Sequence, residues 1–238
     1  MANDVVTIRD RVSRRQQLPE EVASYVRELI ISGAVKPGEF LRMERIAEQV
    51  GVSNTPVREG LLSLRSEGFV QLVPRRGFVV APFTQQDVRD LFWAQAQLAR
   101  ELAARAAKKI TPEQIARLDL NLEQLQKAVA AGDTERIADL GHAFHREINL
   151  AADSHRLALL LGSVVNHLPN RFYASIEAQV AATRNEHPDL VEALRKHDAR
   201  KARSLMDQHI LASADHLIDI LEERGLWGTR PGGQESAS

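Results

Sequence analysis

The chain has 238 residues, of which 44% are hydrophobic, 26% charged and 5% aromatic, a balance typical of a globular protein that favours helix over sheet. A net charge of −1 excludes nucleic-acid binding through bulk positive charge, so any such binding requires a local basic patch. The lack of cysteine excludes disulfides and thiolate metal sites, and without a signal peptide or an apolar run of about 20 residues we expect a cytoplasmic protein with no membrane partner.

The N-terminal third alternates short helical patterns with turns. Residues 1–17 are polar and Arg-rich, and they are predicted to form a flexible arm, either without regular structure or with a short helix. From Leu18, apolar residues on one face predict a helix that stops at Gly33. A turn in "AVKPGEFL" leads to two short helices, in "MERIAEQVG" and "SNTPVREGLLSLRSEG". Two extended pieces joined by "PRRG" predict a hairpin that completes a head over residues 18–81.

Three short helices followed by a two-stranded wing predict a winged helix-turn-helix. The helix that Ser53 caps would be the recognition helix, because its exposed first turn can meet base edges in the major groove. Arginine pairs with guanine and asparagine with adenine, while the arginines of the wing tip suit phosphate or the minor groove. The predicted DNA contacts are Ser53, Asn54, Thr55, Arg58, Arg75, Arg76 and Gly77.

The run "ISGAVKPGEFL…IAEQVGVSNTPVREGLLSLRSEGFVQLVPRRGFVV" closely resembles the DNA-binding head of the GntR family of bacterial transcription regulators. This resemblance implies that the head reads double-stranded operator DNA, and that a homodimer binds a pseudo-palindromic site. One position departs from the family, which usually has Arg where this chain has Asn54, and that Arg often contacts a guanine. We therefore hypothesise that the operator differs from the common family half-site at that base and favours adenine.

After Pro82 the sequence carries helical patterns and no strand signal. Thr111 followed by Pro112 is a typical helix start. These patterns predict a mainly α protein whose second part, residues 82–224, is an all-helical antiparallel bundle, followed by a disordered tail over 225–238. The predicted helices span about 84–109, 111–131, 134–152, 155–182, 187–197 and 199–223.

Three of the eight histidines lie on predicted helices with apolar neighbours at helical spacing. These are His145, His187 and His209. Neutral imidazoles that converge inside a bundle suit a divalent cation such as Zn, Ni or Mn. Alternatively, each of them is a hydrogen-bonded core residue.

The stretch "FHREI … EHPDLVEALRKHDARKARSLMDQHI" resembles the FCD effector domain of the FadR branch. Many members of that branch bind a metal through one Asp and three His, and a small carboxylate often completes the shell. His145, His187 and His209 match the three His positions. The Asp position is Gly141, so the resemblance implies a site with fewer protein ligands and with positions open to water or effector.

Relatives also commonly carry an Arg and a Glu on the first helix of this domain. In this chain Gln95 and Ala99 occupy those places, so a strong carboxylate clamp is missing. Arg171 could partly replace it, because arginine suits planar anions. We expect Gln95 and Arg171 to contact a small-molecule effector, which is either a carboxylate or less acidic than the family norm.

Three functions are compatible with these patterns. The first is a ligand-responsive regulator whose helical domain serves effector binding and dimerisation. The family resemblance implies a repressor, because repression is the commoner arrangement in that family. The second is a constitutive DNA-binding dimer with a degenerate pocket. The third is a metal-dependent enzyme, which lacks a convincing general base because Glu186 and its neighbour His187 diverge by about 100° on a helix.

Overall fold

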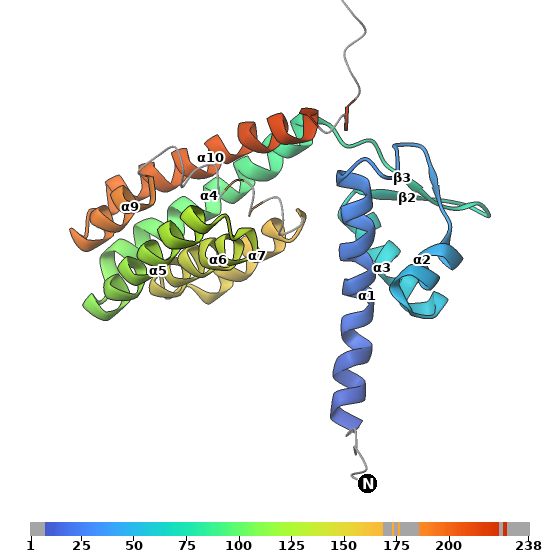
Figure 1. Ribbon diagram of the computed structural model, residues 1–238, viewed down its shortest axis with the longest axis horizontal. Coiled ribbons are helices and arrows are strands. Elements are labelled where there is room, and N and C mark those ends of the chain that lie inside the picture. The colour runs from blue at the N-terminus through green and yellow to red at the C-terminus, as the bar shows by residue number, and fades with distance from the viewer. Residues whose placement is uncertain (1–7, 169–172, 174–175, 177–185, 224–225, 228–238) are drawn as a thin grey trace, which may run out of the picture. The chain divides into compact units, whose positions relative to one another are not determined.

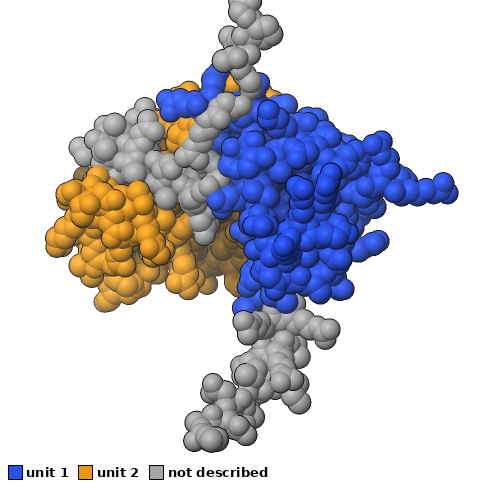
Figure 2. Space-filling model, turned by 45° about the vertical axis from the view of Figure 1, so that its right-hand side comes forward, with its two compact units in different colours: residues 1–84, 221–238 blue, residues 85–220 orange. Residues whose placement is uncertain are grey.

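In the computed structural model, residues 8–168, 173, 176, 186–223 and 226–227 are described. They form two compact units, one of residues 1–84 with 221–238 and the other of residues 85–220 (Figure 2). The predicted fold class is confirmed: a small sheet with three helices makes the first unit, and the second is helical (Figure 1). Within the described residues, no helix has both the length and the apolar character needed to cross a bilayer.

Helices α1 and α3 pack together and build the core of the first unit. Buried aliphatic side chains on both helices face each other, among them Val22, Val26, Leu61 and Leu64. The packing is close at Gly60, where a methyl group would lie 2.6 Å from the carbonyl oxygen of Pro19. The elements of this unit are α1 (Ile8–Ile31), β1 (Phe40–Leu41), α2 (Met43–Val50), α3 (Asn54–Ser66), β2 (Val70–Val73) and β3 (Gly77–Val80).

The N-terminal helix is longer than the sequence predicted. It begins at Ile8 and not near Leu18, so residues 8–17, which we expected in a flexible arm, continue it. This segment contains no glycine and is rich in Arg and Gln, which are good helix formers, whereas Pro19 suggested a helix start. Residues 1–7 of the predicted arm lie outside the described residues.

The wing has three strands and not two. Strand β3 is central and pairs antiparallel with β2, with Leu72 opposite Phe78, and with the two-residue strand β1, with Phe40 opposite Val79. We predicted a turn for the segment that holds β1. Two residues are too few to show the alternation of apolar and polar residues that identifies a strand, so only the pairing reveals it.

In the second unit, helix α4 contacts α6, α7 and α9, and α5 packs on α6. Alanines of α4 and leucines of α9 lie in one buried core with Phe144 and Ile148 of α6. Helix α5 starts as predicted, with a capping box in which Thr111 accepts from the N–H of Gln114 and the Gln114 side chain accepts from the N–H of Thr111. The helices are α4 (Gln85–Lys109), α5 (Pro112–Ala131), α6 (Thr134–Ala151), α7 (His155–Val165), α9 (Glu186–Arg195) and α10 (Ala199–Glu223).

The helix predicted over 155–182 is wrong as a single element. Helix α7 ends at Val165, with Asn166 as its C-cap. Pro169 follows three residues later, and a proline shortly after a helix end is a common stop signal that the apolar periodicity had masked. Within 169–185 only Tyr173 and Ile176 are described, and both are helical.

The end of helix α10 belongs to the first unit. Its last residues, from Leu221, group with that unit, and beyond it the indole N–H of Trp227 donates a hydrogen bond to the carbonyl oxygen of Phe83 over 2.8 Å. Apart from Leu226 and Trp227, the tail predicted to be disordered, residues 225–238, lies outside the described residues.

Candidate functional site

The first turn of helix α3 is presented to solvent. Ser53 takes the N-cap position in an extended conformation, with φ −81° and ψ 169°, and its side chain makes no capping hydrogen bond. One side of the helix is held in the core by Val57 and Leu61, so the opposite side is free. The four residues that the sequence predicted here, Ser53, Asn54, Thr55 and Arg58, are all exposed.

The wing tip is a tight turn that carries two exposed arginines. The N–H of Arg76 donates to the carbonyl oxygen of Val73 over 3.0 Å, and Arg75 has a left-handed φ of 62°. The guanidinium of Arg76 lies 4.5 Å from the ring centre of Phe40, a cation–π contact that orients it. Gly77 has φ 98°, which a residue with a Cβ rarely adopts. The tip therefore presents two positively charged side chains to solvent, next to a glycine whose backbone another molecule can approach closely.

The three predicted histidines come together in the second unit from three different helices. His145 lies on α6, His187 on α9 and His209 on α10. One ring nitrogen from each lies within 4.8 Å of the others, and the Nε2 atoms of His145 and His209 are 3.3 Å apart. His187 and His209 are buried, and His145 is half-buried. Phe144 packs its ring 4.3 Å from that of His187 and contributes an apolar wall.

This cluster fits a divalent metal. Metal–nitrogen bonds of 2.0–2.1 Å at angles of about 90–110° place two nitrogens roughly 3.0–3.4 Å apart, which matches the spacing of His145 and His209. The Nδ1 atom of His209 lies 2.9 Å from Oε2 of Glu186. A carboxylate that accepts the Nδ1 proton leaves the lone pair on Nε2, which is the arrangement that metal-bound histidines usually have.

A cavity of about 340 Å³ opens beside the cluster, between α4, α6, α7 and α10. Its wall is mostly apolar, and it includes His145 and His209. Gln95 is buried in the wall and donates from Nε2 to the hydroxyl of Tyr173 over 3.1 Å, and that hydroxyl donates to the carbonyl oxygen of Val165. Burial raises the pKa of Tyr173, so its hydroxyl is neutral at physiological pH. The cavity suits a small organic molecule.

The remaining predicted positions of the helical domain differ in whether they line the cavity. Gly141 and Ala99, the two positions where the family resemblance implied acidic groups, both line the cavity and carry no charge. No carboxylate stands among the described lining residues. Arg171 lies outside the described residues. Sequence reasoning missed Arg146, which lines the cavity directly after His145, and its one available signal was that adjacency.

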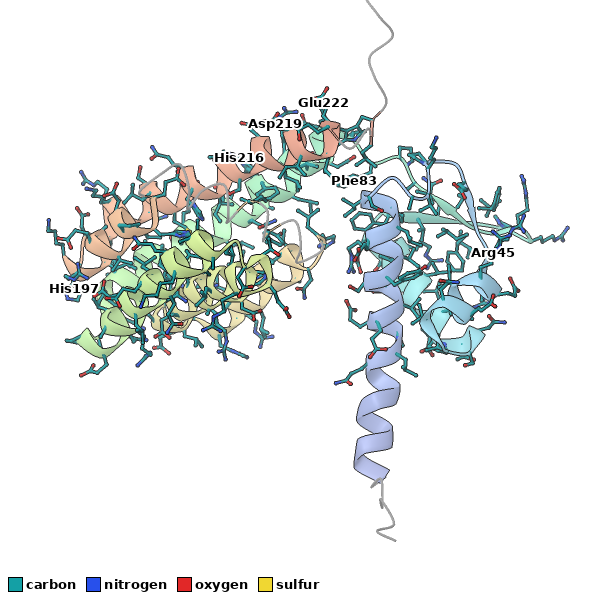
Figure 3. The ribbon with its side chains drawn as sticks, in the orientation of Figure 1. Arg45, Phe83, His197, His216, Asp219 and Glu222 are labelled. Atoms are coloured by element: carbon teal, nitrogen blue, oxygen red, sulfur yellow. The ribbon has the colours of Figure 1, made fainter. Side chains whose placement is uncertain are left out.

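The other five histidines, which the sequence left as structural, divide into two groups. His142 and His155 line the cavity. His197, at the turn between α9 and α10, lies with Nδ1 2.8 Å from the carbonyl oxygen of Ala107 and so ties that turn to α4 (Figure 3). His216 on α10 and His167 after α7 contact carbonyl oxygens of the preceding turn.

Two family models match the chain. Residues 18–80 match the bacterial regulatory proteins of the gntR family, and residues 90–212 match the FCD domain. The chain belongs to the GntR family, in its FCD-bearing, FadR-like branch. As a GntR regulator with an FCD domain it is a DNA-binding transcription regulator, in a family of regulators and not of enzymes.

Relatives of this family align with three quarters or more of the chain. The HTH-type transcriptional repressor RspR of Escherichia coli is 24% identical over 224 residues, which cover 93% of this chain and 98% of RspR. The HTH-type transcriptional repressor GlaR of Escherichia coli is 28% identical over 192 residues, covering 76% of this chain and 87% of GlaR. Among solved structures, E. coli McbR/YncC superposes with a TM-score of 0.63 at 26% identity, covering 87% and 98% of the two chains.

Proposed function

We propose that this GntR regulator is a ligand-responsive repressor that acts in the cytoplasm and binds a pseudo-palindromic operator as a homodimer. A divalent metal (Zn, Ni or Mn) would be held by His145, His187 and His209, and a small-molecule effector would bind in the adjacent cavity. The sense of regulation is supported by the relatives RspR and GlaR, which are named repressors.

The observation that carries the effector part is the convergence of three imidazoles at the wall of a cavity. Each comes from a different helix, and two of them line the cavity directly. With Gly141 in place of a carboxylate, the three histidines leave coordination positions open. The metal would supply a Lewis acid there that fixes a donor atom of the effector. The cavity wall would contribute the apolar contacts.

The DNA part rests on the exposed first turn of α3 and on the wing tip. Asn54 and Arg58, one turn apart, reach the same side of the recognition helix, where they can contact base edges. Arg75 and Arg76 are exposed cations suited to phosphate or the minor groove. The homodimer matches its two-fold axis to that of paired half-sites about one helical turn apart.

Coupling between effector and DNA would be a shift between populations of two dimer geometries. Helix α4 lines the cavity with Phe92 and Gln95, and only residues 81–84 separate it from the central strand of the wing. A ligand that contacts α4, α6, α7 and α10 together favours the arrangement of helices that fits it best. The differential affinity for the two arrangements sets the size of the response.

The test starts with metal content. Protein expressed in metal-supplemented medium and purified without chelator should carry about one divalent ion per chain by elemental mass spectrometry. His187→Ala should lose the ion. His216→Ala is the matched control, since His216 lies on α10 outside the cluster, and it should keep the ion. A wild type with no more metal than His187→Ala contradicts the metal site.

Operator binding is then measured on DNA selected by the full-length protein from a random library. Fluorescence anisotropy with and without Zn²⁺ tests whether the affinity responds to the site. The replacements at Gly141, Gln95 and Ala99 favour one competing function, a constitutive DNA-binding dimer. That function predicts an operator affinity that neither Zn²⁺ nor a library of metabolite acids changes. A sedimentation measurement that returns a monomer at micromolar concentration contradicts the dimer.

A further inference from the structure

The rim of the cavity differs from its interior. Arg146 and Asn149 of α6 line the cavity from one side, and His155 of α7 lines it from the other. Leu150 and Leu159 line the same rim and are 58% and 55% exposed. The rim therefore combines polar groups with an apolar surface that is open to a ligand.

Arg146 carries the one permanent positive charge among the described residues that line the cavity. It is exposed, and with the described residues it makes neither an ion pair nor a hydrogen bond. By contrast, the polar groups of the interior are engaged with one another: Gln95 with Tyr173, and the hydroxyl of Ser213 with the carbonyl oxygen of His209. Among the described lining side chains, a negatively charged group that enters the cavity thus finds its one permanently charged cation at the rim.

We propose that Arg146, assisted by Asn149, is the subsite for the anionic group of the effector, and that the effector is a small amphipathic organic anion. Its apolar body lies against Leu150, Leu159 and the apolar wall, where binding buries surface that is now exposed. This inference rests on the proposed function, in which the cavity holds the effector. It supplies an anion contact where Gln95 stands in place of the arginine that the resemblance implied.

Position on the helix separates this subsite from the metal cluster. Arg146 follows His145 and points about 100° away from it around α6, whereas Asn149 and Leu150 lie three and four residues further, on the same face as Arg146. The anion at the rim and the three imidazoles therefore occupy different parts of the wall. A guanidinium is suited to carboxylate, sulfonate and phosphate oxygens through paired N–H donors.

The test uses two dyes that differ in one charged group. 1-Anilinonaphthalene-8-sulfonate is an amphipathic anion, and N-phenyl-1-naphthylamine has the same aromatic body without the sulfonate. Both are titrated by fluorescence into the full chain and into four variants. These are Arg146→Gln, Arg146→Lys, the charge-matched control Arg156→Gln, and Gly162→Leu. Arg156 is exposed on α7 and does not line the cavity. Gly162 lines it and has open space where a side chain would project.

We expect Arg146→Gln to weaken binding of the sulfonate about tenfold and to leave the neutral dye unchanged, with Arg146→Lys in between and Arg156→Gln like wild type. Gly162→Leu should weaken both dyes. If Arg146→Gln binds the sulfonate as wild type does while Gly162→Leu binds it more weakly, the proposed anion subsite is wrong, but ligand binding in the cavity is supported. If Arg146→Gln weakens both dyes equally, Arg146 only shapes the rim. If Gly162→Leu affects neither dye, the cavity takes up no ligand and the proposed function fails as well.

Discussion

The Nδ1 atom of His209 lies 2.9 Å from a carboxylate oxygen of Glu186, which directly precedes His187 in helix α9. Two consecutive residues of α9 therefore take part in the cluster: His187 is one of its three histidines, and Glu186 contacts another of them, His209. The contact fixes the plane of the His209 ring and turns its Nε2 atom toward His145. Glu186 is therefore a positioning residue and not a general base aimed at an open site.

Glu186→Gln should weaken Zn²⁺ binding about tenfold, because loss of a carboxylate behind a metal-bound histidine typically costs that much or more. The measurement is a competition titration against a chromogenic chelator. Glu192→Gln is the matched control, since Glu192 lies on the same helix and pairs with Arg195 and Lys196 at the surface. Equal affinity for Zn²⁺ in the two variants would argue against a positioning role for Glu186.

The first unit contains a buried ion pair that locks α1 to the end of α3. Arg27 is 4% exposed and donates from Nη2 and Nε to the same oxygen of Glu67, over 2.7 and 3.2 Å. Ser63 donates to the other carboxylate oxygen. Glu67→Leu removes the close partner of the buried guanidinium and leaves only the exposed Glu20 at 3.9 Å, so it should lower the free energy of unfolding of this unit by about 3 kcal/mol.

Hydrogen exchange of peptides from α1 and α3 measures that change within the full chain. The double variant Arg27→Met/Glu67→Leu removes both charges and should recover most of the lost protection, because a buried pair replaced by apolar residues is often close to neutral. A double variant as unprotected as Glu67→Leu alone would mean that packing, and not the unpaired charge, causes the loss.

Two glycines provide opposite expectations for the same substitution. At Gly60 an added methyl would lie 2.6 Å from the carbonyl oxygen of Pro19 and 3.0 Å from Cβ of Val22, so Gly60→Ala should destabilise the first unit by about 1–3 kcal/mol. At Gly162, inside α7, the methyl meets nothing within 4 Å, and Ala should stabilise by up to about 1 kcal/mol. Differential scanning calorimetry of both variants checks the pair; matching melting temperatures would refute the packing argument.

Much of the fold follows from local signals in the sequence. The helix starting at Pro112 carries its own cap in Thr111 and Gln114, so its start needs no tertiary information. The three histidines were found because each stands on an amphipathic helix, and an inward position follows from the neighbouring apolar residues. Their convergence, in contrast, rested on the resemblance to the FCD domain.

Most of the misses arise where the decisive contact is distant in sequence, and strand β1 exists only through its pairing with β3. The end of α7 is an exception, because its stop signal, Pro169, is local but was masked by the apolar periodicity that continues past Val165. Arg146 was overlooked because an arginine on a helix reads as a solvated surface residue until the facing wall of α7 is known. The hydrogen bond of Gln95 to Tyr173 spans 78 positions, which no local pattern predicts.

Arg75 separates the stability of the wing from its proposed contact with DNA. Its left-handed φ of 62° costs about 1–2 kcal/mol for a residue with a Cβ, whereas glycine adds about 0.5–1 kcal/mol of unfolded-state entropy, so Arg75→Gly should leave stability equal or slightly raised. Operator affinity should nevertheless fall, and the slope of log K against log salt should shrink by about one. Arg75→Lys keeps the charge and should keep the slope. An unchanged slope in Arg75→Gly would place the tip away from phosphate.

Asn54 allows a specific prediction about which DNA sequence the protein recognises. It is exposed at the start of α3, at the position where the GntR family usually has Arg. An asparagine amide matches the N6 and N7 atoms of adenine, while a guanidinium matches O6 and N7 of guanine. Selection from a random DNA library should thus return an operator that favours adenine at one symmetric position in the wild type. Asn54→Arg should convert that position to guanine, with a discrimination of about 1–3 kcal/mol, and leave the other positions as they were.

Thr55→Ala is the control for that experiment, since it alters the neighbouring exposed side chain without offering a guanidinium. It should not create a guanine preference. If wild type and Asn54→Arg select the same half-site, Asn54 does not contact a base, and the specificity of the head must come from Arg58 and from the shape of the DNA. If the wild type already selects guanine there, a different side chain reads that base, and the departure from the family at this position carries no consequence for recognition.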